Sequence, residues 1–139
     1  MSQMTKYFTV AEANRTLPLV KRIVDDITAV YPAWRELVYR YELVAAKARP
    51  EWGESPEQVD LRQQIDTVAW QINGYLLELD QIGCIFKGFD AGLVDWFGLI
   101  DGRDVFWCWK QGEEKIEYWH EVDAGFAGRQ PLPTVVGAG

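Results

Sequence analysis

Residues 56–89 read PEQVDLRQQIDTVAWQINGYLLELDQIGCIFKGF, and the change of hydrophobic period within this stretch decides the fold. Up to Ile82, apolar residues recur at alternating steps of four and three, which is typical of a helix with one apolar stripe. The stripe consists of Leu61, Ile65, Val68, Ile72, Tyr75, Leu79 and Ile82. Ser55 can cap this helix, Gln58 can complete a capping box, and Gly83 supplies the left-handed residue that commonly ends a helix. The pattern predicts a helix over residues 56–82.

The preceding segment carries a second stripe with the same alternation. Its members are Val20, Val24, Ile27, Tyr31, Trp34, Val38, Tyr41, Ala45 and Ala48. A capping box formed by Thr9 and Glu12 predicts that helical structure begins at about Val10. Because proline lacks an amide hydrogen, Pro18 predicts a break or kink at residues 16–17, then a helix of about 31 residues with a kink at Pro32. Joined by a short turn at residues 49–54, the two stripes predict an antiparallel, coiled-coil-like hairpin over about residues 10–82.

After Gly83 the hydrophobic period becomes two, and β-branched and aromatic residues punctuated by glycine predominate. We predict strands over residues 84–89, 92–100, 103–110 and 115–121, with a two-residue turn at Asp101 and Gly102 and a longer turn over 111–114. The predicted fold class is α+β, a long antiparallel helical hairpin followed by a small antiparallel β-meander. We expect one domain over residues 1–132, which ends in a loop over 122–132, and a disordered tail over 133–139.

Composition and charge argue against several classes of partner. The chain has 139 residues and a net charge of −7, which opposes binding to nucleic acid. No apolar run approaches the ~20 residues of a membrane helix, and the N-terminal segment has no secretory signal, so we expect a cytoplasmic protein with no membrane partner. Cys84 and Cys108 have apolar and aromatic neighbours, so we expect reduced, buried thiols.

Five segments of the chain form a recognisable pattern. They are YFTVAEANRTLPLV at 7–20, GC at 83–84, GLVDW at 92–96, GRDVFWCWKQGE at 102–113 and WHEVDAGFAGRQPL at 119–132. In these segments the chain resembles an uncharacterised bacterial family, domain of unknown function 2203, over about residues 6–132. Trp96 stands where this resemblance leads us to expect phenylalanine, an exchange of one aromatic residue for another. The resemblance implies the fold described above and implies no activity.

Strand pairing decides which side chains share a face of the sheet. A two-residue turn at 101–102 sets Asp95 opposite Cys108, and a four-residue turn at 111–114 sets Cys108 opposite Glu117. This register predicts one mixed face that carries Asp95, Cys108, Glu117 and Glu121, and a core-packing face that carries His120. The mixed face is either a half-solvated surface or the floor of a site.

His120 is the only histidine, so any general base near neutral pH or any imidazole metal ligand has to be this residue. The candidate catalytic residues are His120, Glu121 and Asp95, and the alternative is a satisfied histidine at a strand end. No cysteine or histidine pair has the spacing of a structural zinc site, so we expect no metal and no cofactor. A weaker, oxygen-rich metal site that uses Asp95, Glu117, Glu121 or His120 stays open.

The segment GFAGR at residues 125–129 is a candidate anion-binding site. Gly125 and Gly128 would let backbone N–H groups approach an anion, and Arg129 could bind a carboxylate or phosphate through two hydrogen bonds. Alternatively, the segment ties the C-terminus across the body, with Arg129 paired to an acidic helix face. No nucleophile elbow or nucleotide-binding motif is found in the sequence.

Two functions fit these features. The sequence favours a non-catalytic cytoplasmic interaction or scaffolding protein that forms a homodimer through its hairpin, because the helices are too long and their stripes too wide for the sheet to cover. The alternative is a small-molecule or metal-dependent enzyme with its site between the β-meander and the GFAGR loop. For such an enzyme we expect His120 to lie near Arg129 and near Glu121 or Asp95.

Overall fold

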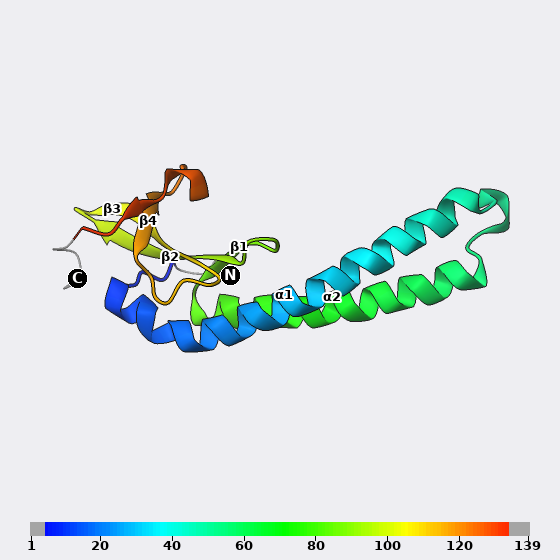
Figure 1. The fold of residues 1–139 in the computed structure, drawn as a ribbon, viewed down its shortest axis with the longest axis horizontal. Coiled ribbons are helices and arrows are strands. Elements are labelled where there is room, and N and C mark those ends of the chain that lie inside the picture. Colours follow the sequence, from blue (N-terminus) through cyan, green and yellow to red (C-terminus); the bar gives the residue numbers. More distant parts are fainter. Residues whose placement is uncertain (1–4, 134–139) are drawn as a thin grey trace.

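The computed structural model describes residues 5–133, and it consists of two long helices followed by a five-stranded antiparallel sheet. The elements are α1 (Val10–Lys47), η1 (Pro50–Trp52), α2 (Pro56–Ile82), β1 (Ile85–Gly88), β2 (Leu93–Ile100), β3 (Arg103–Lys110), β4 (Tyr118–Glu121), η2 (Phe126–Gly128) and β5 (Gln130–Pro131). Figure 1 shows the hairpin of α1 and α2 reaching far beyond the sheet. The α+β class predicted from the sequence is confirmed. The predicted tail, apart from its first residue, lies outside the described residues.

The ends of both helices follow the local sequence. The Thr9 hydroxyl accepts a hydrogen bond from the Glu12 amide at 3.0 Å, and the Glu12 carboxylate accepts one from the Thr9 amide at 2.8 Å. Ser55 and Gln58 form the same reciprocal pair at the start of α2. Gly83 ends α2 in the left-handed conformation, with a φ of 107° that favours glycine.

Of the break or kink predicted at residues 16–17, the break is wrong, because α1 continues through Pro18 and Pro32 as one helix of 38 residues. Figure 1 shows instead a change of direction between the first turns of α1 and the rest of the helix. Leu17 and Val20, on either side of Pro18, are buried in the core. Their packing outweighs the loss of the one hydrogen bond that Pro18 cannot donate.

The strands lie in chain order from β1 to β5, each antiparallel to the next. β2 and β3 pair as predicted, with Ile100 opposite Arg103 and Asp95 opposite Cys108. Asp101 at φ 51° and Gly102 at φ 75° form the tight turn between them. β5 is a fifth strand that the sequence did not predict, since it pairs with β4 from within the segment expected to be a loop.

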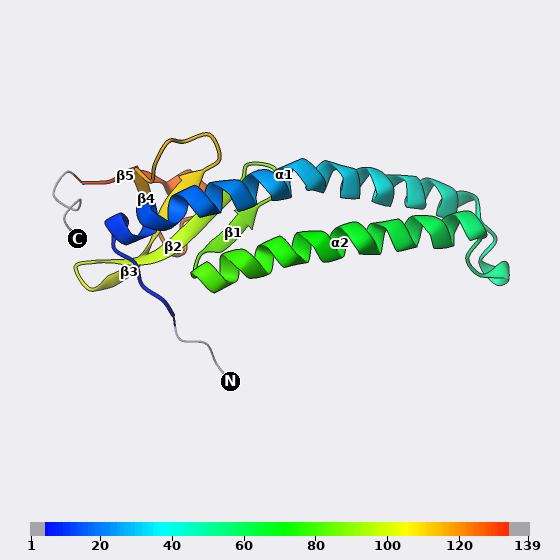
Figure 2. The ribbon, with the colours of Figure 1, turned by 90° about the horizontal axis from the view of Figure 1, so that it is seen from below.

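The helices cover one face of the sheet, which we call the inner face. Its buried residues are Val94, Trp96, Val105, Trp107, Trp109 and Trp119. They pack with the N-terminal half of α1, which lies along the sheet in Figure 2. The Trp107 indole donates a hydrogen bond to the Phe8 carbonyl at 2.7 Å, and the Trp96 indole donates one to the Thr16 hydroxyl at 3.0 Å. The opposite face, which we call the outer face, is not covered by the helices.

The two helices meet along the predicted seam. Its buried members are Val24, Ile27, Leu61, Ile72 and Leu79, and its half-buried members are Val38 and Ile65. Within residues 5–133, none of the helices combines the length and the apolar character that crossing a membrane requires.

Candidate functional site

The pairing of β3 with β4 differs by one residue from the predicted register. Cys108 lies opposite Tyr118, not opposite Glu117. Because side chains alternate between the two faces of a strand, this shift moves His120 to the outer face and Trp119 to the inner face. The outer face therefore carries Asp95, Cys108 and His120 together.

The cause of the shift lies in the turn between the two strands. The Ile116 amide donates to the side-chain oxygen of Asn14 in α1 at 2.9 Å, and not to a strand. The Glu113 carboxylate accepts a hydrogen bond from the Lys110 amide at 2.7 Å, which extends the turn. β4 consequently begins at Tyr118, three residues later than predicted.

Asp95, Cys108 and His120 form a compact buried cluster. They come from the adjacent strands β2, β3 and β4, and they are respectively 2%, 1% and 2% exposed. The carboxylate oxygen, the thiol sulfur and an imidazole nitrogen all lie within 4.8 Å of one another. Three groups that can each donate an electron pair thus meet at one point beneath the outer face.

The imidazole of His120 is held at both nitrogens. Nδ1 lies 2.7 Å from the carbonyl oxygen of Glu121, which can only accept, so Nδ1 carries a hydrogen. Nε2 lies 3.1 Å from Oδ2 of Asp95. An imidazole nitrogen and a carboxylate oxygen would otherwise repel each other through their lone pairs. This contact therefore requires either a shared proton or a bound cation.

Asp95 also holds a buried oxygen that has no hydrogen-bond donor. Its Oδ2 faces His120 and lies 3.7 Å from the Lys87 ammonium, but Oδ1 has no partner among the described residues. A buried polar atom without a partner costs about 1–3 kcal/mol. Three buried side-chain atoms of the described residues lack a partner, and Asp95 Oδ1 is the only acceptor among them, since Trp34 Nε1 and Arg129 Nε are donors. It is therefore the one that a cation could satisfy.

Cys108 is a poor nucleophile as it stands. Burial raises the pKa of its thiol to about 12, and the charge of Asp95 adds to the effect. Both nitrogens of His120 already face oxygen atoms, so the ring offers no free nitrogen to deprotonate the thiol. The arrangement therefore lacks the geometry of a cysteine–histidine–aspartate triad.

The cluster forms the floor of a cavity of about 280 Å³ on the outer face. Its lining consists of Lys87, Leu93, Asp95, Cys108, His120, Gly125 and Phe126. The first part of the GFAGR segment thus meets the β-meander at the cavity, in the region that the sequence suggested for an enzyme site. The cavity is open to solvent on one side and can admit a small molecule.

Arg129 and Gly128, two of the residues predicted to bind an anion, make contacts within the chain, while Nε of Arg129 is buried without a partner among the described residues. Arg129 Nη2 lies 2.7 and 2.9 Å from the two oxygens of Glu113, and its guanidinium lies over the ring of Tyr118, 4.1 Å from the ring centroid. The Gly128 amide donates to the carbonyl of Gly125 at 3.1 Å. These contacts favour the alternative in which the segment fastens the C-terminus, although the partner of Arg129 lies in a turn and not on a helix.

The remaining predicted residues lie away from the cluster. Glu117 is exposed. The Glu121 carboxylate lies 2.8 Å from the guanidinium of Arg103, so only the backbone carbonyl of Glu121 takes part in the site. Sequence reasoning placed Cys108 on the mixed face but did not name it among the candidate site residues, and it did not consider Lys87. The Asp95–Cys108 pairing was predicted from the sequence, and the expected nearness of His120 to Asp95 is confirmed at 3.1 Å, although the predicted register placed His120 on the other face. The contacts of Arg129 are instead with Glu113 and Tyr118.

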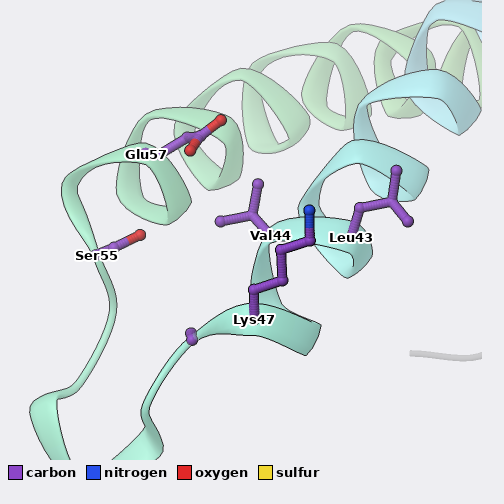
Figure 3. Close-up of a pocket in the computed structure, with 6 residues that line it drawn as sticks. Leu43, Val44, Lys47, Ser55 and Glu57 are labelled. Atoms are coloured by element: carbon purple, nitrogen blue, oxygen red, sulfur yellow. The ribbon is translucent and has the colours of Figure 1, made fainter.

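A second hollow, of about 360 Å³, lies at the open end of the hairpin. Its lining includes Leu43, Val44 and Lys47 of α1 and Ser55 and Glu57 near the start of α2, and Figure 3 shows the end of α1 opposite the start of α2. The Ser55 hydroxyl already caps α2. Although this hollow is larger than the outer-face cavity, it contains no buried polar atom without a partner among the described residues, and it is a weaker candidate.

Comparison with known proteins identifies a family and no activity. The family model described as "Uncharacterized conserved protein (DUF2203)" matches residues 6–132. Neither the search of curated proteins nor the search of solved structures finds a match to the chain. Because the family model spans nearly the whole chain, the protein belongs to the DUF2203 family.

Proposed function

We propose that the protein is a cytoplasmic enzyme that acts on a small molecule, with its active site at the outer-face cavity. The observation that carries this proposal is the Oδ1 atom of Asp95, which is buried at the cavity floor without a hydrogen-bond partner among the described residues. The sequence favoured a scaffold because the helices are longer and their apolar stripes wider than the sheet can cover, and it left an enzyme as the alternative. The presence of Cys108 and His120 beside Asp95 reverses that preference.

The physical argument is that burial of the Asp95 carboxylate costs free energy that its contacts do not offset. A buried carboxylate that served only stability would have both oxygens hydrogen-bonded, since desolvation of a charge is expensive. Here one oxygen is unpaired, and the nearest cation, Lys87, has a side chain that is 41% exposed. Groups whose arrangement lowers the stability of the fold are found most often at functional sites.

The substitution Asp95→Asn tests this proposal. Asparagine has the same shape, and its amide can donate to Nε2 of His120. We expect the purified variant to unfold at the same temperature as the parent or higher, whereas a strain that carries it on the chromosome behaves like the deletion strain in growth competition. Asp104→Asn, which changes an exposed carboxylate that accepts from Tyr7, is the control and should retain the cellular role.

The opposite result would assign the cluster to structure. Removing one partner from a structural buried ion pair costs about 3–5 kcal/mol. A loss of that size in Asp95→Asn, together with an unchanged cellular role in the folded fraction, contradicts the proposed active site.

Self-association through the hairpin is a second candidate function. On α2, Trp70 is 80% exposed and Leu77 is 61% exposed, which is unusual for side chains of this size on a monomer. α2 carries five acidic side chains and one basic one, whereas α1 carries six basic and five acidic ones. The net charge is thus −4 on α2 and +1 on α1, so two copies of α2 would repel each other, and this favours a twofold dimer with α1 of one copy against α2 of the other.

A further inference from the structure

We infer that Asp95, Cys108 and His120 bind a divalent transition-metal ion of the zinc type. The role of this ion as a cofactor rests on the active site proposed above, whereas its binding does not. Neither the sequence motifs nor the family match points to this combination of ligands. The inference follows from the register of β4 and from the atoms that this register brings together.

The donor set suits a borderline-soft ion. One thiol, one imidazole and one carboxylate are ligands that zinc accepts together, and a thiolate disfavours magnesium and calcium. The three residues come from three neighbouring strands, so the rigid sheet fixes their spacing. Sites on strands are held more firmly than sites on loops.

The spacing suits a tetrahedral ion. Zinc bonds of the usual lengths hold nitrogen, oxygen and sulfur ligands about 3.3–3.6 Å apart. In the structure Nε2 of His120 and Oδ2 of Asp95 are 3.1 Å apart, and all three donor atoms lie within 4.8 Å of one another. Side-chain rotations that move the donor atoms by about 1 Å would bring all three within bonding distance of one ion.

The orientation of His120 is that of a metal ligand. Histidines that bind metals donate the other ring N–H to a carbonyl or a carboxylate, which fixes the tautomer and directs the free lone pair at the ion. Nδ1 of His120 makes this hydrogen bond to the Glu121 carbonyl at 2.7 Å, and Nε2 faces Asp95. A cation between Nε2 and Oδ2 of the carboxylate would replace the shared proton, and coordination by both carboxylate oxygens would also give Oδ1 a partner.

Three protein ligands leave one position of a tetrahedral ion free, which is the pattern of catalytic zinc sites. The cavity is lined by all three ligands, so this position can be reached by water or substrate. Lys87 lines the same cavity and lies 3.7 Å from Asp95. When the ion takes up the charge of Asp95, the Lys87 ammonium becomes available to a carboxylate or phosphate. The substrate class we infer is a small anion that presents an oxygen to the metal.

Titration of the metal-free protein with Co²⁺ tests the metal site. Cobalt occupies zinc sites and reports a thiolate ligand through a sulfur-to-metal charge-transfer band in the near ultraviolet. We expect the parent protein to give this band at one equivalent, and Zn²⁺ to abolish it by displacement. Cys108→Ser and His120→Asn should lose the band and weaken cobalt binding more than about 100-fold. Mutation of a residue that only hydrogen-bonds a metal ligand already lowers metal affinity about 10–100-fold.

Two further variants keep the test decisive. Cys84 is the matched control, since its thiol is also buried and its pKa is also raised to about 12, yet it lies in the inner core; Cys84→Ser should keep the band. Lys87→Met removes the cation that competes for Asp95 and should tighten cobalt binding by up to about fivefold, which corresponds to the free energy of an exposed ion pair.

A band that survives in a folded Cys108→Ser variant, or no band in the parent, overturns the metal site. Either result leaves the Asp95→Asn test of the active site standing, so the two failures are distinguishable.

Discussion

His120 of β4 and Asp95 of β2 face each other across the intervening strand β3, with Nε2 of the imidazole 3.1 Å from Oδ2 of the carboxylate. The two residues are 25 positions apart in the chain. Cys108 of β3, opposite Asp95 in the register, completes the cluster between them. The three ionisable groups of the cluster thus lie on the outer face of the sheet. The inner face carries tryptophans and packs against helix α1.

The hairpin seam predicts the effect of Ile72→Ala. Ile72 is 6% exposed between the helices, so truncation should leave a cavity and lower the free energy of unfolding by about 2–5 kcal/mol. Leu77→Ala is the control, because Leu77 is 61% exposed on the same helix and should cost less than about 1 kcal/mol. Urea denaturation followed by circular dichroism gives both values. Equal losses would contradict the seam.

The packing of Trp107 on the inner face predicts a strong effect of Gly98→Ala. A Cβ at position 98 would clash with the Trp107 ring, and that ring is fixed by its hydrogen bond to the Phe8 carbonyl. We expect a loss of about 2 kcal/mol or more in the free energy of unfolding. In contrast, Gly74→Ala in α2 meets no atom within 4 Å and should raise stability by about 0.5–1 kcal/mol. A neutral Gly98→Ala would show that Trp107 packs elsewhere.

The capping box at the start of α1 predicts a pH dependence. Hydrogen bonds from Thr9 hold the pKa of Glu12 below its usual value of 4.5. Because the folded-state pKa is the lower one, the stabilisation is present above pH 4.5 and is lost as the pH falls through the folded-state value. Glu12→Gln keeps an oxygen that can accept from Thr9 and should flatten this part of the stability profile. Thermal melts between neutral and acid pH measure the difference, and identical slopes in the two proteins would contradict it.

The exposed apolar side chains of α2 predict a homodimer. Light scattering at micromolar concentration should give twice the chain mass of 16.0 kDa. Trp70→Ala should shift the protein toward the monomer, whereas Trp52→Ala, which removes a tryptophan that is 75% exposed at the hairpin tip, should not. Added salt should weaken the dimer, because opposite charges on α1 and α2 contribute. A mass of one chain that persists on concentration excludes this assembly.

Local signals in the sequence were sufficient for the framework of the fold. The capping boxes at Thr9 and Ser55, the left-handed Gly83 and the tight turn at Asp101 and Gly102 each act over a few residues, and all four lie where predicted. Strand pairing across that turn followed from its length, which placed Asp95 opposite Cys108. These features depend on short-range geometry and are readable from sequence.

The candidate site depended on a contact that sequence does not reveal. The hydrogen bond from Ile116 to Asn14 joins residues 102 positions apart and lengthens the turn before β4. One residue of extra turn inverts which side chains of β4 face outward, so His120 was predicted for the wrong face. The continuity of α1 through Pro18 has a similar origin, since burial of Leu17 and Val20 against the sheet overrides a local propensity.

The most direct test of the account is a crystal structure of the protein grown with zinc, with diffraction data collected on both sides of the zinc absorption edge. We predict an anomalous difference peak bonded to Sγ of Cys108, Nε2 of His120 and an oxygen of Asp95, with a fourth ligand from solvent on the cavity side. An ordered cluster without such a peak, with Nε2 of His120 still in direct contact with Oδ2 of Asp95, would contradict the metal site.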